Sequence, residues 1–171
     1  MKEYWLNENK LDFKVLRSPK MPLRIYSKAH KGLVISCHDI FIEYLGGLLL
    51  VRRESAPARG LFWPIGGRIK RGFSVEDSLK LKVKEECNLN LDKITELGHA
   101  RWYSNSEPFG HKKGTDAVSF VYFAKGSGKL KLNKLHSNAL IIMPKDYNKF
   151  RRSLNNYVRD YMDIAMRHLK Q

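Results

Sequence analysis

The stretch that decides the fold is GLFWPIGGRIKRGFSVEDSLKLKVKEECNLNL, residues 60–91. An apolar run ends in the glycine pair Gly66 and Gly67, and a basic loop follows. Glycine lets the backbone come close to a ligand and expose its N–H and C=O groups. Together with a helix that ends in the carboxylates Glu85 and Glu86, this pattern predicts a site that holds a metal ion and a phosphate.

The helix in this stretch is expected over about residues 75–88. Ser74 is a suitable N-cap and has Asp77 three residues later, which is close to a capping box. Asn88 tolerates the left-handed conformation that ends many helices. One apolar face, at a spacing of four residues, is formed by Val75, Leu79 and Val83.

A second face of this helix carries charge. Positions 82, 85 and 86 are three or four residues apart, so their side chains share one face. Glu85 and Glu86 would give Mg²⁺ or Mn²⁺ oxygen ligands. The alternative is an exposed helix with a Lys82–Glu86 ion pair, worth about 0.3 kcal/mol. Spacing alone leaves both interpretations open.

Runs of apolar and β-branched residues predict strands on both sides of the helix. Residues 33–44 and 48–54, joined at Gly46-Gly47, predict a hairpin. Later strands are expected over residues 94–104, 115–124 and 139–143. A final helix is expected over about residues 145–169. Strands around a central helix, with a second helix at the end, predict a layered α/β or α+β domain.

The size of the chain bounds its organisation. Its 171 residues, 43% of them hydrophobic, suffice for one domain with a real core and argue against disorder. We expect residues 1–30 to form an N-terminal arm that packs on the body, and residues 31–171 to form a single domain. No stretch approaches the roughly 20 apolar residues that span a bilayer, so we expect no membrane partner.

Charge and cysteine usage bound the partners and the compartment. The formal net charge of +15 favours an anionic partner, and composition does not choose among a nucleotide, a nucleic acid and a membrane surface. Cys37 and Cys87 lie far apart and match no metal-binding spacing. We therefore expect two reduced thiols in a cytoplasmic protein.

Residues 67–89 resemble the Nudix box, a glycine followed by a glutamate and then a glutamate-rich helix. The sequence keeps the box residues Gly67, Val83, Glu85, Glu86 and Leu89. It departs from the box at Phe73, Leu81, Lys82 and Asn88. The resemblance implies a Nudix-type α/β/α sandwich with a mixed β-sheet over residues 31–171.

The flanking segment RESAPARGLFWPIGGRI, residues 53–69, is similar to that of GDP-mannose mannosyl hydrolases, a Nudix branch with a reduced box. The resemblance implies that Arg53 and Arg68 contact the substrate diphosphate, and it matches Asp39 to a substrate-binding position. It also implies that His136, in the loop before the last strand, is the general base. Tyr103, where a strand meets a loop, is a candidate contact for the sugar or base.

The resemblance also implies a divalent cation, Mg²⁺ or Mn²⁺. Its ligands would be the Gly66 carbonyl and Glu86, with Glu85 as a further candidate. The position of another family ligand, a Gln, is taken by Leu135. We therefore expect weaker metal binding without nucleotide, and we hypothesise that Lys82 stands near the diphosphate and partly substitutes for metal charge.

The expected function is hydrolysis of a nucleoside diphosphate-linked substrate, in particular a nucleotide sugar such as GDP-mannose. His136 would deprotonate a water that attacks the sugar carbon, while Arg53 and Arg68 stabilise the departing nucleoside diphosphate. The alternatives are a Nudix pyrophosphatase, in which water attacks phosphorus, and a catalytically weak or inactive nucleotide- or RNA-binding module. The positive charge is spread along the chain, so nucleic acid is not the favoured partner. A homodimer is expected from the relatives.

Overall fold

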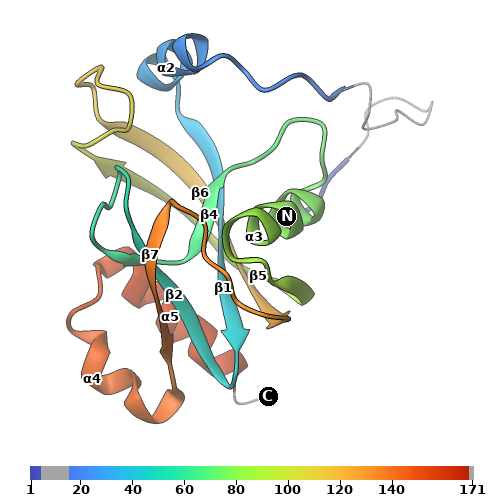
Figure 1. Cartoon of the computed structure of the whole chain (residues 1–171), viewed down its shortest axis with the longest axis vertical. Coiled ribbons are helices and arrows are strands. Elements are labelled where there is room, and N and C mark those ends of the chain that lie inside the picture. The colour runs from blue at the N-terminus through green and yellow to red at the C-terminus, as the bar shows by residue number, and fades with distance from the viewer. Residues whose placement is uncertain (5–15, 170–171) are drawn as a thin grey trace.

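The structure, a computed structural model, describes residues 1–4 and 16–169, and its strands form one seven-stranded mixed sheet (Figure 1). The strands are β1 (Ile35–Tyr44), β2 (Gly47–Arg53), β3 (Phe62–Trp63), β4 (Ile65–Arg68), β5 (Asn90–Ser104), β6 (Thr115–Ser127) and β7 (His136–Ile142). The main order is β3-β2-β1-β6-β5, and in addition β4 pairs with β1 and β7 with β2. Strands β1 and β6 are parallel, and the other pairs are antiparallel.

The predicted hairpin is formed by β1 and β2, in which Ile42 lies opposite Leu49. Its turn consists of Leu45 and Gly46, with φ of 52° and 82°. Two-residue hairpins favour positive φ at both turn positions, because that twist matches the twist of the strands. Gly47 already belongs to β2, so the turn lies one residue earlier than the glycine pair suggested.

The predicted central helix is confirmed as α3 (Val75–Cys87). The Ser74 hydroxyl accepts a hydrogen bond from the Asp77 backbone N–H at 3.0 Å, which is the expected N-cap. Asn88 ends the helix in the left-handed conformation, with φ of 59°. The apolar face is also confirmed, because Val75, Leu79 and Val83 are buried.

The two faces of the sheet are covered by different helices, which confirms the sandwich (Figure 1). Ile40 and Ile42 of β1 pack with the apolar face of α3. Phe41, between them in sequence, points to the opposite face and packs with α5 (Asn156–His168). Because successive side chains of a strand alternate between faces, one apolar strand serves both layers.

The C-terminal segment is not one helix, so that prediction was wrong. It forms a 3₁₀ turn (Pro144–Asp146), a short helix α4 (Tyr147–Arg151) and α5. The Ser153 hydroxyl donates to the Phe150 carbonyl, and the Asn155 side chain accepts from the Tyr157 N–H at 3.0 Å. These side chains satisfy backbone groups locally and start a new helix, although the apolar spacing continues across the break.

The N-terminal arm contains the helix α2 (Leu23–Gly32), which crosses the expected boundary at residue 30. Residues 5–15 of the arm lie outside the described residues. The Tyr26 ring packs edge-on against Phe109, with centroids 5.1 Å apart, so α2 contacts the loop between β5 and β6. Within the described part of the chain, no helix is long and apolar enough to cross a membrane.

Candidate active site

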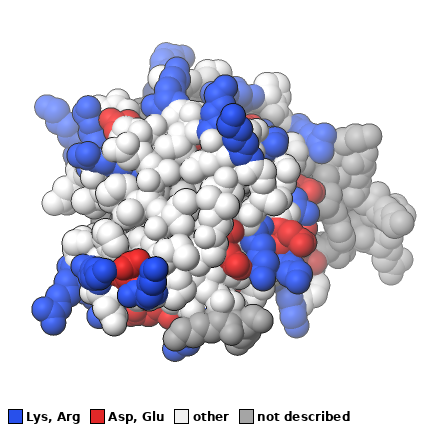
Figure 2. All heavy atoms as spheres, turned by 60° about the horizontal axis from the view of Figure 1, so that its bottom comes forward, with Lys and Arg blue, Asp and Glu red and all other residues white. Residues whose placement is uncertain are grey.

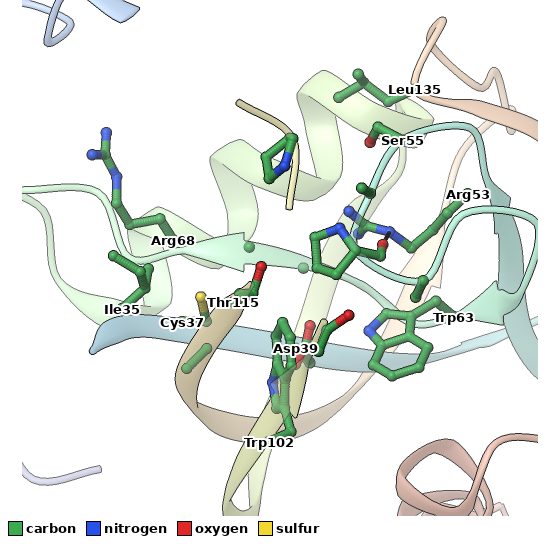
Figure 3. Close-up of a pocket in the computed structure, with 18 of the residues that line it drawn as sticks. Ile35, Cys37, Asp39, Arg53, Ser55, Trp63, Arg68, Trp102, Thr115 and Leu135 are labelled. Atoms are coloured by element: carbon green, nitrogen blue, oxygen red, sulfur yellow. Dashed lines mark hydrogen bonds between the residues drawn. The ribbon is translucent and has the colours of Figure 1, made fainter. Parts of the chain in front are cut away.

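A pocket of about 410 Å³ lies between β1, β4, the C-terminal half of α3 and the loops that surround them. Figure 3 shows Asp39, Arg53 and Trp63 around one space, with Arg68 farther out. Seven of the eight predicted site residues line this pocket: Asp39, Arg53, Gly66, Arg68, Glu86, Tyr103 and His136. The sheet and α3 therefore bring together residues that are up to 97 positions apart in the sequence, from Asp39 to His136.

Glu86 is one of the two carboxylates that line the pocket, with Asp39, and it is buried, with 5% of its surface exposed. One oxygen, Oε1, lies 3.3 Å from Lys82 Nζ, one helical turn earlier. The other, Oε2, lies 3.0 Å from His136 Nε2. Burial opposes the ionised form, but the hydrogen bond from His136 and the charge of Lys82 outweigh it and lower the pKa of Glu86. Glu86 is therefore held as an anion between two nitrogen groups.

His136 is the first residue of β7, where it lies opposite Arg53 of β2. From the sequence we expected His136 in the loop before the last strand. That expectation was wrong, because the strand begins at His136 itself. When Nε2 carries the proton and donates it to Glu86, Nδ1 keeps a free lone pair. Nδ1 is buried and has no hydrogen-bond partner among the residues that the structure describes. The ring thus has the tautomer that a general base needs.

Arg53 ends β2 with its guanidinium turned into the pocket (Figure 3). Its Nε donates to the Pro57 carbonyl at 2.9 Å, and this hydrogen bond fixes the plane of the guanidinium group. Burial lowers the pKa of Arg53, and the carboxylates of Asp39 and Glu86 oppose that shift. Within the described chain no residue accepts a hydrogen bond from its Nη groups, so these donors are available to an anionic ligand.

Asp39 lies at the bottom of the pocket, on β1, and only 4% of its surface is exposed. Burial raises its pKa, while hydrogen bonds from Tyr157 and Ser119 act in the opposite direction. The Tyr157 hydroxyl of α5 donates to Asp39 Oδ2 at 2.7 Å. A single carboxylate thus joins the sheet to α5 and faces the pocket.

Gly66 has to be glycine because Asp39 occupies the space beside it. The two residues lie opposite each other in the β1–β4 pair. A Cβ atom on Gly66 would overlap Asp39 Oδ1 and lie 2.6 Å from the His38 carbonyl oxygen. The glycine pair therefore lets β4 approach the Asp39 carboxylate, in addition to exposing backbone groups toward the pocket.

Arg68 and Tyr103 lie at the edge of the pocket. The Arg68 guanidinium stacks on the Tyr26 ring of α2, with Cζ 4.2 Å from the ring centroid. Tyr103 is 68% exposed, and the Arg101 guanidinium lies 5.3 Å from its ring centroid. Both residues can contact a ligand only where it leaves the pocket, which suits the outer end of an extended substrate.

Glu85 is the predicted site residue that the structure does not bring to the described pocket. Its side chain is about half exposed and lies 3.8 Å from Lys70 Nζ. Within residues 1–4 and 16–169, no group of three or more His, Cys, Asp and Glu side chains is arranged to hold a metal ion. Glu86 is the predicted carboxylate ligand that lines the pocket, and both of its oxygens already face nitrogen groups.

Several pocket residues were not predicted from the sequence. Tyr157 lies 118 positions from Asp39, and nothing in its surroundings marks it as more than a core residue of an amphipathic helix. Tyr26 and His30 bring α2 to the pocket wall. His30 Nδ1 lies 2.8 Å from His111 Nε2, so the helix contacts the loop between β5 and β6. These contacts are tertiary and leave no local pattern.

Trp63 illustrates a residue with two roles. It belongs to the core cluster on the α5 side of the sheet. Its ring also stacks on Tyr157, with centroids 5.2 Å apart, and lines the pocket beside Trp102. The pocket therefore has an aromatic wall as well as cationic groups, which suits a ligand with both an apolar ring and an anionic part.

Known proteins are similar to this chain in fold and, weakly, in sequence. A MutT NUDIX hydrolase from Burkholderia pseudomallei superposes with a TM-score of 0.63 at 21% identity, covering 77% of this chain and 97% of its own. The NUDIX domain of Shewanella oneidensis NrtR, solved in complex with ADP ribose, gives a TM-score of 0.61 at 18% identity and covers 87% of this chain and 99% of its own.

A curated relative and a family model complete the comparison. The low-salt glycan biosynthesis protein Agl8 of Haloferax volcanii is 26% identical over 126 residues, which are 73% of this chain and 78% of that protein. The model of the NUDIX domain matches residues 39–150, more than half of the chain. That span contains Asp39, the strand β4, α3 with Glu86, and His136. The chain belongs to the NUDIX domain family.

Proposed function

We propose that the chain hydrolyses a nucleoside diphosphate linked to a sugar. The observation that carries the proposal is that one pocket joins the Glu86–His136 contact, at 3.0 Å, to the guanidinium of Arg53. A carboxylate that orients a histidine can activate a water, and an arginine fork can stabilise a diphosphate leaving group. The GDP-mannose mannosyl hydrolase branch, which the sequence resembles, is the type of activity proposed.

The two kinds of pocket lining, cationic and aromatic, support a nucleotide sugar as the proposed substrate. The diphosphate lies against Arg53 and Lys82 and reaches Arg68 at the edge, while the aromatic wall of Trp63 and Trp102 takes a ring. Two relatives support this choice. The NUDIX domain of NrtR binds ADP ribose in its crystal structure, and Agl8 is a glycan biosynthesis protein by name. We extend both properties to this chain as a proposal.

The proton transfer follows from the geometry of His136. His136 removes a proton from the attacking water through Nδ1, and Glu86 stabilises the imidazolium that forms. Because Nδ1 is buried, water must reach it, or the ring must turn, when substrate is bound. The oxygen of the water forms a bond to the sugar carbon as the bond from that carbon to the diphosphate oxygen breaks. The departing negative charge then lies beside Arg53 and Lys82.

Nudix hydrolases generally use divalent metals such as Mg²⁺ or Mn²⁺, and the requirement of this chain for one stays a prediction. The side chains of the pocket do not fit a cation held by the protein. Mg²⁺ needs near-octahedral oxygen ligands. Two carboxylates line the pocket: Glu86 already faces Lys82 and His136, and Asp39 accepts a hydrogen bond from Tyr157. No step of the proposed reaction is therefore assigned to a metal.

The test is turnover of a panel of nucleotide sugars by the full chain. Reactions with Mg²⁺, with Mn²⁺ and with EDTA are scored for free sugar and for released phosphate. We expect at least one nucleotide sugar to be converted to nucleoside diphosphate and free sugar. We expect His136→Asn to lower kcat about 100-fold or more, while the exposed control Glu85→Gln leaves it near the wild-type value. Equal activity of His136→Asn and wild type would contradict the role of His136.

A second candidate function is nucleotide binding without turnover. The ion pair between Lys82 and Glu86 favours it, because this pair occupies one oxygen of the Glu86 carboxylate. In that case a nucleoside diphosphate binds, and no member of the panel is hydrolysed with either metal. A pyrophosphatase, the third alternative, would instead release a nucleoside monophosphate. The expected homodimer stays a prediction.

Nucleic-acid binding is not favoured by the distribution of charge. Figure 2 shows a face on which Lys and Arg gather in separate groups, several of them beside Asp or Glu, around an uncharged centre. Single-stranded nucleic acid is usually held by a continuous positively charged groove with stacked aromatic rings. On the described residues of this face such a groove is not visible, although the net charge is +15.

A further inference from the structure

The pocket contains a cation of its own, the ammonium group of Lys82. Its Nζ lies 3.3 Å from Glu86 Oε1, and the two side chains are 26% and 7% exposed. Lys80, on the same helix, also pairs with a glutamate four residues away, but there both side chains are much more exposed, at 46% and 60%. The same type of ion pair thus occurs twice on α3, once in solvent and once inside the pocket.

Lys82 also lies over the glycine pair. A Cβ atom on Gly67 would be 3.4 Å from Lys82 Nζ and 3.6 Å from Lys82 Cε, and no other described atom outside its chain neighbours comes within 4 Å. The ammonium group therefore lies between the Gly67 backbone and the Glu86 carboxylate. A cation bound to Glu86 Oε1 would need a distance of about 2.1 Å from that oxygen, close to the ammonium group that now faces it.

Two positive charges at one carboxylate oxygen repel each other, and the effect is stronger in a partly buried site than in water. The residues present therefore disagree with a cation held at Glu86, and they supply positive charge at the same place. A lysine ammonium has three donors and binds phosphate as a point charge. It can contact Glu86 and still offer donors to a phosphate.

We propose that Lys82 takes the place of a divalent cation in this pocket, so that the chain binds the diphosphate of a nucleotide without Mg²⁺ or Mn²⁺. The proposal rests on the proposed function, since it assigns the diphosphate to the same pocket. Unlike the proposed function, this inference concerns only binding of the diphosphate, whether or not the substrate is then hydrolysed. The ammonium offsets the phosphate charge, and Glu86 keeps it in position.

The test is calorimetric titration of the full chain with GDP and, separately, with ADP, each in EDTA and in excess MgCl₂. We expect at least one of them to bind in EDTA, with affinity changed less than about threefold by Mg²⁺. Lys82→Ala should weaken binding in EDTA by about tenfold or more, the effect of one charge-assisted hydrogen bond. Lys80→Ala is the matched control and should bind as wild type does.

Two further variants separate charge from structure. Lys82→Arg keeps the charge and should retain binding in EDTA, which a purely structural role of lysine would not predict. Lys82→Glu places a second carboxylate one turn from Glu86. It should lose binding in EDTA and regain about tenfold or more with Mg²⁺ or Mn²⁺, because two carboxylates and a phosphate suit such an ion. Circular dichroism of each variant checks that α3 is intact.

The outcomes are distinguishable. If wild type binds only with Mg²⁺ or Mn²⁺ and Lys82→Ala behaves the same, the inference is overturned and the proposed hydrolysis stands. If GDP and ADP both fail to bind under every condition, the inference falls together with the assignment of nucleoside diphosphates to this pocket. Binding in EDTA that Lys82→Ala leaves unchanged overturns the role of Lys82 and keeps the substrate class.

Discussion

Replacement of Gly66 by alanine tests the packing that forms the bottom of the pocket. The added methyl group would overlap Asp39 Oδ1 and lie 2.6 Å from the His38 carbonyl oxygen. The carboxylate can rotate only by giving up its 2.7 Å hydrogen bond from Tyr157, and the carbonyl belongs to the central strand. Overpacking of a core costs about 1–3 kcal/mol, and a contact with backbone places Gly66→Ala near about 3 kcal/mol.

The assay is urea unfolding of wild type and Gly66→Ala, followed by circular dichroism. For a domain of this size, a loss of about 3 kcal/mol lowers Tm by about 6–12 °C. Gly32→Ala is the matched control, because no atom of the other residues that the structure describes, apart from the backbone of its own helix and its chain neighbours, lies within 4 Å of the Cβ position of Gly32. It should be neutral or slightly stabilising. A Gly66→Ala variant whose unfolding free energy stays within about 0.5 kcal/mol of wild type would refute the described packing of β4 on Asp39.

Two further predictions concern the buried polar groups next to the pocket. Burial, aided by the charge of Lys82, lowers the pKa of His38 from 6.5 to about 4. The folded state thus favours the neutral form of the His38 imidazole. The free energy of unfolding should therefore fall as pH drops from 6.5 to about 4, by about 3 kcal/mol in total. His38→Gln should flatten that slope, and an unchanged slope would contradict the assignment. Tyr157→Phe should destabilise the fold by about 1–3 kcal/mol, since it removes the 2.7 Å hydrogen bond to Asp39. Urea unfolding measures this loss, with Tyr161→Phe as the control. An equal loss in Tyr161→Phe would contradict a specific role of the Tyr157–Asp39 hydrogen bond.

Much of the fold follows from local sequence. Ser74 and Asn88 mark the ends of α3, and alternation along β1 provides apolar side chains to both layers. The prediction of a single C-terminal helix was wrong. The periodicity of apolar residues continues through residues 152–155, but Ser153 and Asn155 satisfy backbone groups there and interrupt the helix. Side-chain hydrogen bonds of single polar residues decided the break, and a periodic pattern does not report them.

The pocket residues that lie close together in the sequence could be predicted. Arg53, Gly66 and Glu86 lie within the stretch that carries the family resemblance, and all three line the pocket. The contact of Tyr157 with Asp39 and the packing of α2 on the pocket wall were not predictable, because each joins elements far apart in the chain. Lys82 was predictable in part. The sequence shows a lysine four residues before Glu86, but only the structure shows that it is partly buried beside Glu86.

Hydrolysis in ¹⁸O-water shows whether the water activated by His136 attacks the sugar carbon of a nucleoside diphosphate-linked sugar. The products of any nucleotide sugar that turns over are separated and weighed by mass spectrometry. We expect one ¹⁸O atom in the free sugar and none in the nucleoside diphosphate. Label in a phosphate group, with unlabelled sugar, would contradict it and would indicate attack at phosphorus.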